Sequence, residues 1–471
     1  MEIKDLKPEL VWKFFSELSE IPRGSGNEQA VSDYLVNFAK ERNLEVRQDD
    51  ALNVVFKKDA TEGYEDKPTI ALQGHMDMVC VKEDDSDHDF SKDPIKLLIK
   101  DGWVTADGTT LGADDGMGVA YILAIFDDED VVHGPLEAII TTGEEVSMIG
   151  ANELDTSDIK ADYLINIDTE DDGILTIGCA GGCDLEISFK KEKEAAQGEF
   201  LKLDLRGFEG GHSGMEIDRG RLNAIKTVGR LLAGIDGVQI ASINGGVKRN
   251  AIASTAQVTF AVADKDAAKK ELEQRIADIL NESKDTDPNG KITLEDASFD
   301  GEVLTKQLSE NIVNTLYTLP DGLIKKHEGE IISSSNLGIL EEDENEVRIV
   351  SMIRSQIDSA KFNRAAISKK IAEQFGAHCE VNNPYTGWQR EETKLIDIAN
   401  DIWKEQTGSE MIVETTHGGL ECGLFKGVMP NVEMLSFGPT IEGAHSPTER
   451  VNIESTEKNY KFLVELLKEP S

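Results

Sequence analysis

The tetrapeptide Gly74-His75-Met76-Asp77 closes an apolar run, Thr69-Ile70-Ala71-Leu72. This run predicts a buried strand. Because successive side chains of a strand point to opposite faces, we expect His75 and Asp77 to point the same way where the strand ends. An imidazole beside a carboxylate suits a metal ligand and the group that orients it. A histidine and an aspartate two residues apart occur easily by chance, so the meaning of this pair depends on the rest of the chain.

Two further apolar runs of this kind also end in acidic residues. The run 135–142 leads into Gly143-Glu144-Glu145, and the run 163–167 leads to Asp168. Ligands bind outside the carboxyl ends of the strands in open α/β sheets. Since neighbouring side chains diverge, one of the two glutamates can bind a metal while the other faces a substrate. One solvated acid at a strand end is unremarkable, but three such strand ends indicate a common site.

A glycine-rich loop supplies another pair of acids. Residues 111–118 read LGADDGMG and are followed by an apolar segment that predicts a helix. Paired acids at a helix N-terminus have an ordinary explanation in capping and in the helix dipole. The flanking glycines, however, let the backbone come close to a compact ligand. At this point both interpretations of Asp114 and Asp115 stay open.

The composition describes a soluble globular chain with a strongly acidic balance. Its 471 residues suffice for two or three domains, and 39% of them are hydrophobic. The formal net charge of -41 disfavours binding to nucleic acid and to anionic membranes. There is no apolar run long enough to span a membrane and no signal-like start. The five scattered cysteines are expected as buried thiols in a reducing cytosol, so we expect a cytoplasmic protein.

The pattern of predicted elements changes twice along the chain. Helices and strands alternate up to about residue 185, and this α/β pattern returns after about residue 385. The stretch between holds strand-like segments and amphipathic helices such as 267–281. We therefore expect a discontinuous catalytic domain of residues 1–185 and 386–471, with an inserted α+β domain at 186–385. About 200 residues is long for one such unit, so the inserted part could have two lobes. Helices are also expected at 9–20, about 28–41 and about 453–467.

The order of motifs resembles that of the zinc-dependent M20 metallopeptidases. The matching motifs are GHMDMVC, TLGADDGMG, TTGEE, NIDTED, GCAGG, GGHSG, RNAI, THGGLECG and GAHSPTE, from residue 74 to 449. The chain is most similar to the aminoacyl-histidine dipeptidase branch, the cytosolic non-specific dipeptidases. The resemblance implies a zinc-peptidase-like catalytic domain, in which helices flank a mixed sheet, with an inserted α+β lid domain.

The same resemblance implies a site for two divalent metal ions. Its ligands would be His75, Asp114, Glu145, Asp168 and His445. Asp114 would bridge the two ions, with His75 and Asp168 holding one of them. Glu145 and His445 would hold the other. Histidine together with carboxylates suits Zn²⁺, and Mn²⁺ or Co²⁺ are plausible substitutes. Asp77 would orient His75 through its other ring nitrogen.

The implied chemistry is hydrolysis of a peptide bond by a water that bridges the two ions. Glu144 would act as the general base and pass the proton to the leaving amine. His212 of GGHSG would stabilise the oxyanion, in its own chain or, if the lid forms a homodimer, in a second copy. The candidates for binding the substrate and its free carboxylate are Asn250, Arg354, His417, Gly418 and Gly419. Arg354 could instead form an ordinary ion pair, and His417 could cap its loop.

Three functions remain to be compared. The leading one is a dinuclear metal-dependent dipeptidase that hydrolyses unblocked dipeptides, with a possible preference for C-terminal histidine. An amidohydrolase acting on N-acyl amino acids would use the same metal chemistry, and the motifs do not decide whether a free α-amino group is needed. A non-catalytic binding protein on a peptidase scaffold is disfavoured, because neither Glu144 nor any implied ligand is replaced.

Overall fold

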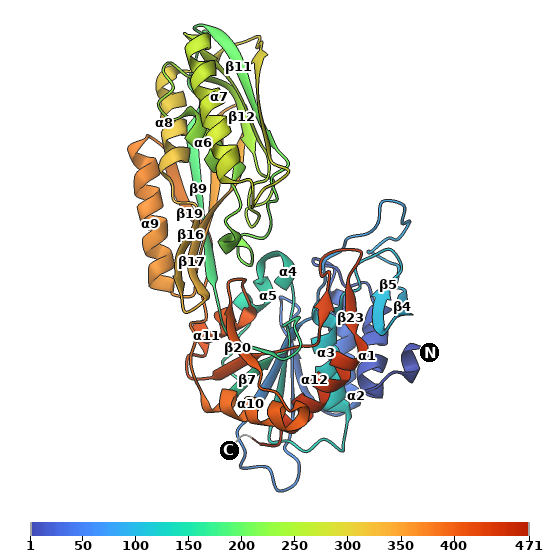
Figure 1. The fold of residues 1–471 in the computed structure, drawn as a ribbon. Helices are drawn as coiled ribbons and strands as arrows, with labels where there is room; N and C mark the ends of the chain where they lie inside the picture. Colours follow the sequence, from blue (N-terminus) through green and yellow to red (C-terminus); the bar gives the residue numbers. More distant parts are fainter. Residues whose placement is uncertain (1, 470–471) are drawn as a thin grey trace. The chain divides into compact units, whose positions relative to one another are not determined.

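The computed structural model describes residues 2–469, and their backbone forms two compact units (Figure 1). The first unit comprises the chain up to Gly178, together with Arg390–Thr415 and the chain from Leu420 onward. The second unit comprises Cys179–Gln389 and Thr416–Gly419. The sequence pattern predicts these boundaries near residues 185 and 386. The roles of the two parts as a catalytic domain and a lid stay predictions.

An eight-stranded mixed sheet forms the centre of the first unit, with the strand order β1-β2-β6-β3-β7-β21-β8-β20. Neighbours β6, β3, β7 and β21 run parallel, whereas β1 and β2 are antiparallel to their neighbours. The strands are β1 Glu45–Gln48, β2 Val54–Lys58, β3 Ile70–His75, β6 Leu136–Thr141, β7 Tyr163–Asn166, β8 Ile174–Cys179, β20 Ile412–Thr416 and β21 Glu433–Ser436. The expected mixed sheet is confirmed.

Helices pack around this sheet, and α3 is the most deeply buried of its neighbours. Gly116–Phe126 of α3 is buried throughout, since the helix lies between α1 and β3. This explains why the segment is apolar on all sides rather than amphipathic. The helices are α1 Glu9–Ser19, α2 Gln29–Glu41, α3 Ala113–Asp127, α4 Glu144–Ser147, α5 Ile149–Glu153, α10 Lys394–Thr407, α11 Glu421–Val428 and α12 Ile453–Leu466. A small antiparallel sheet joins β4 Leu97–Lys100, β5 Trp103–Ala106, β22 Ile441–Glu442 and β23 Arg450–Asn452.

The central strands bring the acidic strand ends together. Every residue of β3 and of β6 is buried, as expected for parallel strands that are covered on both faces. The register pairs His75 with Thr141 on β6, and Gln73 with Asn166 on β7. Because these strands run parallel, the residues that follow their carboxyl ends lie at the same end of the sheet.

The second unit is built on a large antiparallel sheet. Its strand order is β14-β11-β13-β12-β17-β18-β9-β19, with β16 paired to β17 (Figure 1). The helices are α6 Ala224–Leu232, α7 Lys265–Glu282, α8 Lys306–Thr318 and α9 Asp358–Gln374. The strands are β9 Gly181–Lys190, β11 Glu199–Arg206, β12 Gln239–Gly245, β13 Ala256–Val262, β14 Lys291–Ala297, β16 Gly322–His327, β17 Glu330–Glu342, β18 Glu346–Ser355 and β19 His378–Tyr385, and a separate pair joins β10 Lys193–Glu194 to β15 Val303–Leu304. One cluster of buried apolar residues extends from Cys183 to Cys379 and joins sheet and helices.

The structure differs from the expected fold at the segment Thr416–Gly419 and at Cys80. Thr416–Gly419 belongs to the second unit, although the sequence analysis included it in 386–471. The reason is that the Ala180 N–H donates to the carbonyls of Thr416 (3.2 Å) and Gly418 (3.1 Å). Cys80 is exposed in the loop after β3, so the expectation that all five thiols are buried was wrong for this one. Within residues 2–469, no helix combines the length and apolar character needed to cross a membrane.

Candidate metal centre

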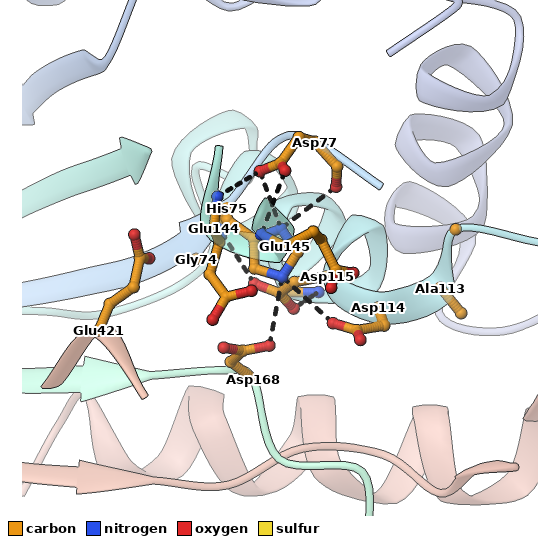
Figure 2. Close-up of polar contacts among 12 residues, drawn as sticks. Gly74, His75, Asp77, Ala113, Asp114, Asp115, Glu144, Glu145, Asp168 and Glu421 are labelled. Carbon is orange, nitrogen blue, oxygen red and sulfur yellow. Dashed lines mark hydrogen bonds and ion pairs between the residues drawn. The ribbon is translucent and has the colours of Figure 1, made fainter. Parts of the chain in front are cut away.

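His75 occupies the end of β3, and its ring is almost fully buried. Its Nδ1 lies 3.2 Å from the backbone oxygen of Asp77 and 3.4 Å from the Oδ1 atom of that residue. Its Nε2 lies 3.2 Å from Asp114 Oδ1 and 3.6 Å from Asp168 Oδ1 (Figure 2). An Nδ1–H that donates to Asp77 leaves the Nε2 lone pair available to a metal ion. The backbone oxygen of Asp77 therefore takes part in orienting the ring beside its carboxylate.

Asp114 lies in the first turn of α3, at the centre of the cluster. Its Oδ2 lies 3.1 Å from the Nε2 atom of His445, while its Oδ1 faces His75. Two groups of candidate ligands share this residue, and within each group the ligand atoms lie within 4.8 Å of one another. One group is His75, Asp114 and Asp168, and the other is Asp114, Glu145 and His445. The structure thus brings together all five residues that were expected to hold the two ions. A further group of His75, Glu144 and Glu145 meets the same distance limit, so the assignment of each residue to an ion stays a prediction.

Glu145 and His445 meet in this cluster although 300 positions separate them in the chain. The Nε2 atom of His445 lies 3.1 Å from Glu145 Oε1 and 3.0 Å from Glu145 Oε2. His445 has a φ of +61°, in the left-handed region that non-glycine residues rarely adopt. A non-glycine residue keeps this backbone conformation only where the surrounding structure holds it, and such residues are common at functional sites. The side chain remains about half exposed, so this side of the cluster is accessible to solvent.

The charges of the cluster are unbalanced without a metal ion. Within residues 2–469, the ion-pair partners of Asp114, Glu145 and Asp168 are the rings of His75 and His445. Burial opposes ionisation of Asp114, yet hydrogen bonds to both histidines hold the pKa of its carboxyl well below its usual range. Burial raises the pKa of Asp168 to about 6. Divalent cations would supply the missing positive charge, and the nitrogen and carboxylate donors suit Zn²⁺, Mn²⁺ or Co²⁺. The residues therefore fit a two-metal site.

Glu144 begins α4 beside these candidate ligands. Its N–H donates to Asp77 Oδ1 (3.1 Å), and the N–H of Glu145 donates to Asp77 Oδ2 (3.4 Å). Asp77 thus orders the start of α4 as well as the ring of His75. Burial raises the pKa of the Glu144 carboxyl well above its ordinary value, and the neighbouring acids Asp168 and Glu145 add to this effect. A buried carboxyl with a raised pKa beside a cluster of candidate metal ligands is a candidate general base.

His212 and Asn250, two of the expected substrate-handling residues, lie next to each other in the second unit. The Nδ1 atom of His212 accepts hydrogen bonds from the amides of Gly214 (3.3 Å) and Met215 (3.1 Å). The N–H of Ser213 donates to the carbonyl of Asn250 at 2.9 Å. Because Nδ1 is an acceptor, the ring proton of a neutral His212 sits on Nε2. How these residues act with the metal cluster stays a prediction.

Arg354 and His417 form a second group in the same unit. The Nε2 of His417 lies 2.8 Å from the hydroxyl of Ser334, a residue that pairs with Arg354 across β17 and β18. Burial and the positive charge of Arg354 lower the pKa of His417 to about 3, so its ring is neutral. Arg354 donates to the hydroxyl of Tyr385 at 3.0 Å. Gly418 and Gly419 follow His417 in Thr416–Gly419, the short segment that belongs to the second unit. The substrate-binding roles of these residues also stay predictions.

Several buried charged residues around the cluster were not assigned a role from the sequence, among them Arg23, Asp115 and Glu449. The carboxylate of Asp115 accepts the N–H of His75 and the N–H of Gly118, each at 3.1 Å. A Cβ on Gly74 or Gly118 would lie within 2.3 Å of an oxygen of this carboxylate. Gly74 and Gly118 therefore leave the space that the Asp115 carboxylate fills. These two glycines are the sequence signal that could have identified Asp115.

Comparison with known proteins gives consistent matches over the whole chain. The model of "Peptidase family M20/M25/M40" matches residues 71–469. The chain is 39% identical over 480 residues to the cytosol non-specific dipeptidase of Escherichia coli K12, covering 99% of each chain. The solved structure of aminoacylhistidine dipeptidase from Vibrio alginolyticus has a TM-score of 0.89 and 37% identity, covering 99% of this chain and 98% of that one. The aminopeptidase PepT structure from Bacillus cereus shares the fold, with a TM-score of 0.58, 18% identity and 98% of each chain covered.

Proposed function

Because the chain belongs to the peptidase family M20/M25/M40, we propose that it is a metal-dependent dipeptidase that hydrolyses the peptide bond of unblocked dipeptides. The observation that carries this proposal is the convergence of the five candidate ligands in two groups that share Asp114. His75 and Asp168 would hold one ion, and Glu145 and His445 would hold the other, with Asp114 shared between them. Zn²⁺ is the ion that this donor set favours, with Co²⁺ or Mn²⁺ as alternatives.

Two divalent ions bound here would supply the Lewis acidity that polarises the scissile carbonyl and lowers the pKa of the attacking water. Glu144 moves the proton, since its carboxyl lies beside the cluster and is assigned to neither ion. Its raised pKa lets it accept a proton from the attacking water and then deliver that proton to the leaving amine. Asp77 keeps Glu144 in place by capping the first turn of α4.

The second unit supplies the groups that handle the substrate. Because the Nδ1 atom of His212 accepts two backbone amides, its ring proton lies on Nε2, where it is a hydrogen-bond donor suited to the developing oxyanion. Arg354, Asn250 and the amides of Gly418 and Gly419 bind the free carboxylate of the dipeptide. Neutral His417 lies beside Arg354 and completes this group. If the second unit forms a homodimer, His212 acts in the other copy.

The substrates are dipeptides with free termini, including those with a C-terminal histidine. The names of two relatives support this proposal: one is a cytosol non-specific dipeptidase, and the other is an aminoacylhistidine dipeptidase. The first name also supports a cytoplasmic location. Acting on N-acyl amino acids would require the same metal chemistry without recognition of an α-amino group.

The experiment is amine release from a panel of dipeptides, including aminoacyl-histidines and the N-acetylated form of each. The chain is assayed with Zn²⁺, Mn²⁺ or Co²⁺, and then with a chelator. We expect cleavage of the free dipeptides that the chelator abolishes. Preferential cleavage of the acetylated forms would replace the dipeptidase with an amidohydrolase, and absence of turnover with all three metals would contradict both.

A further inference from the structure

Glu449 ends the turn that carries His445, and only 2% of its surface is exposed. Its two carboxylate oxygens accept hydrogen bonds from the successive amides of Leu111–Asp114, at N···O distances of 2.7–3.3 Å. The amides of residues 111–114 include the start of α3, which begins at Ala113. The first amides of a helix have no hydrogen-bond acceptor within the helix itself. A carboxylate at this end of a helix also interacts favourably with the helix dipole. Glu449 therefore fixes the backbone that carries Asp114 to the turn that carries His445.

Arg23 contacts the same loop and is equally buried, with 2% of its surface exposed. Its Nη2 donates to the carbonyl of Gly112, and its Nη1 donates to those of Met76 (3.0 Å) and Asp77 (3.2 Å). A Cβ on Gly112 would lie 2.6 Å from Nη2, and a Cβ on Gly116 would lie 2.4 Å from it. These glycines make room for the guanidinium. Arg23 therefore connects the loop of Asp114 with the residues that follow β3.

We propose that Glu449 and Arg23 are positioning residues, a ligand clamp that holds the backbone of Asp114 in register with His445 and His75. The inference rests on the proposed two-metal site, but it assigns residues that bind neither metal nor substrate. Asp114 is shared by both groups of ligands, so its placement matters for both ions. Its partners come from segments more than 300 positions apart in the chain, and no local structure sets their separation.

The chemistry of these contacts explains why the clamp uses charged groups. Hydrogen bonds with an ionised partner are about twice as strong as neutral ones. A neutral amide at position 449 would turn its own N–H₂ group toward backbone donors and leave buried amides without acceptors. The loop 111–114 would then be free to move relative to the turn 443–449. Such outer-shell partners of metal ligands typically account for a 10–100-fold difference in metal affinity.

The test measures Zn²⁺ binding to the full-length chain after metal removal, in competition with a chromophoric chelator. We expect wild type to bind two ions, and we expect His445→Ala to identify the ion that depends on this histidine. Glu449→Gln should raise the dissociation constant of that ion about 10–100-fold. If Glu449→Gln binds both Zn²⁺ ions with wild-type dissociation constants, the clamp is overturned, while the two-metal proposal still stands. A wild-type chain that binds no Zn²⁺ would instead overturn the two-metal proposal.

Glu137→Gln is the matched control. Glu137 is 2% exposed, and its carboxylate accepts the N–H of Lys160 at 2.9 and 3.1 Å in the same unit. We expect this variant to keep both dissociation constants, which separates the clamp from a general effect of losing a buried carboxylate. Far-UV circular dichroism of the metal-free chains reports folding. If Glu449→Gln does not fold, Glu449→Asp decides: a smaller loss of Zn²⁺ affinity supports the clamp, and unchanged constants overturn it.

Discussion

The Nε2 atom of His445 lies 3.1 Å from Oδ2 of Asp114, although 331 positions separate the two residues in the chain. The same ring nitrogen lies 3.0 Å from Oε2 of Glu145. A histidine flanked by two carboxylates is a stable ion pair without metal and a three-ligand site with metal.

Replacing Asp114 by Asn should remove the shared ligand of both ions. We expect the metal content, measured by elemental analysis, to fall from two ions per chain to less than one. Dipeptide hydrolysis should fall by at least roughly 10²-fold in kcat/KM, because metal-site ligands contribute directly to binding of the ions. Asp287→Asn is the control, since Asp287 is a buried carboxylate that accepts backbone amides in the second unit. Full metal content with wild-type turnover in D114N would contradict the shared-ligand assignment.

Glu144 and Glu145 are adjacent, and the proposed mechanism gives them different roles. Glu144→Gln should keep two metal ions and lose about 10²–10⁴-fold in kcat, the usual contribution of a general base. Glu145→Gln should lose metal affinity instead, because Glu145 lies with Asp114 and His445 in the group proposed to hold one of the ions. Steady-state kinetics and metal analysis of the two variants separate these effects. Equal losses of metal in both variants would count against Glu144 as the free proton carrier.

Metal affinity should depend on pH through His445. Hydrogen bonds to Asp114 and Glu145 raise the pKa of this histidine to about 11, so the metal-free ring is protonated at neutral pH. A metal ion must displace that proton, and the apparent affinity should therefore rise with pH, about tenfold per unit for one displaced proton. Competition titrations with Zn²⁺ at pH values from roughly 6 to 9 measure this slope. His445→Ala should flatten it, and an affinity for this ion that falls with rising pH would contradict the assignment.

Local patterns in the sequence were sufficient to predict the elements around the site. The runs at 69–72, 135–142 and 163–167 correspond to β3, β6 and β7, because parallel strands buried on both faces are largely apolar. The motif order also identified the family, and the comparisons confirm the resemblance. The five candidate ligands were named for the same reason, and the structure brings them together.

The remaining features depend on contacts between distant segments. Glu449 contacts amides more than 330 positions away, and no periodicity relates a carboxylate in a turn to the amides it accepts. Arg23 follows Pro22 at the end of a predicted helix, where it resembles an ordinary loop residue. The assignment of Thr416–Gly419 to the second unit likewise depends on hydrogen bonds to Ala180. Such contacts are set by the tertiary fold.

Asp321 should make the stability of the second unit depend on pH. Its Oδ1 accepts the N–H of Leu337 (2.8 Å) and the side-chain amide of Asn223 (3.1 Å), and burial raises its pKa to about 6. The folded chain therefore binds more protons here than the unfolded chain between about pH 4 and 6. The stability that this group contributes is fully present below about pH 4 and is lost as the pH rises through 6.

Asp321→Asn keeps the acceptor oxygen and stays neutral at every pH. We expect its free energy of unfolding to match wild type near pH 4 and to exceed it by about 1–3 kcal/mol at pH 8. Urea unfolding followed by circular dichroism at the two pH values measures the difference. Asp343→Asn is the control, because hydrogen bonds from the amides of Asn345 and Glu346 hold the pKa of Asp343 below its usual range. That variant should gain no stability at pH 8. A D321N chain that is less stable than wild type at pH 8 would show that the ionised carboxylate is favourable here.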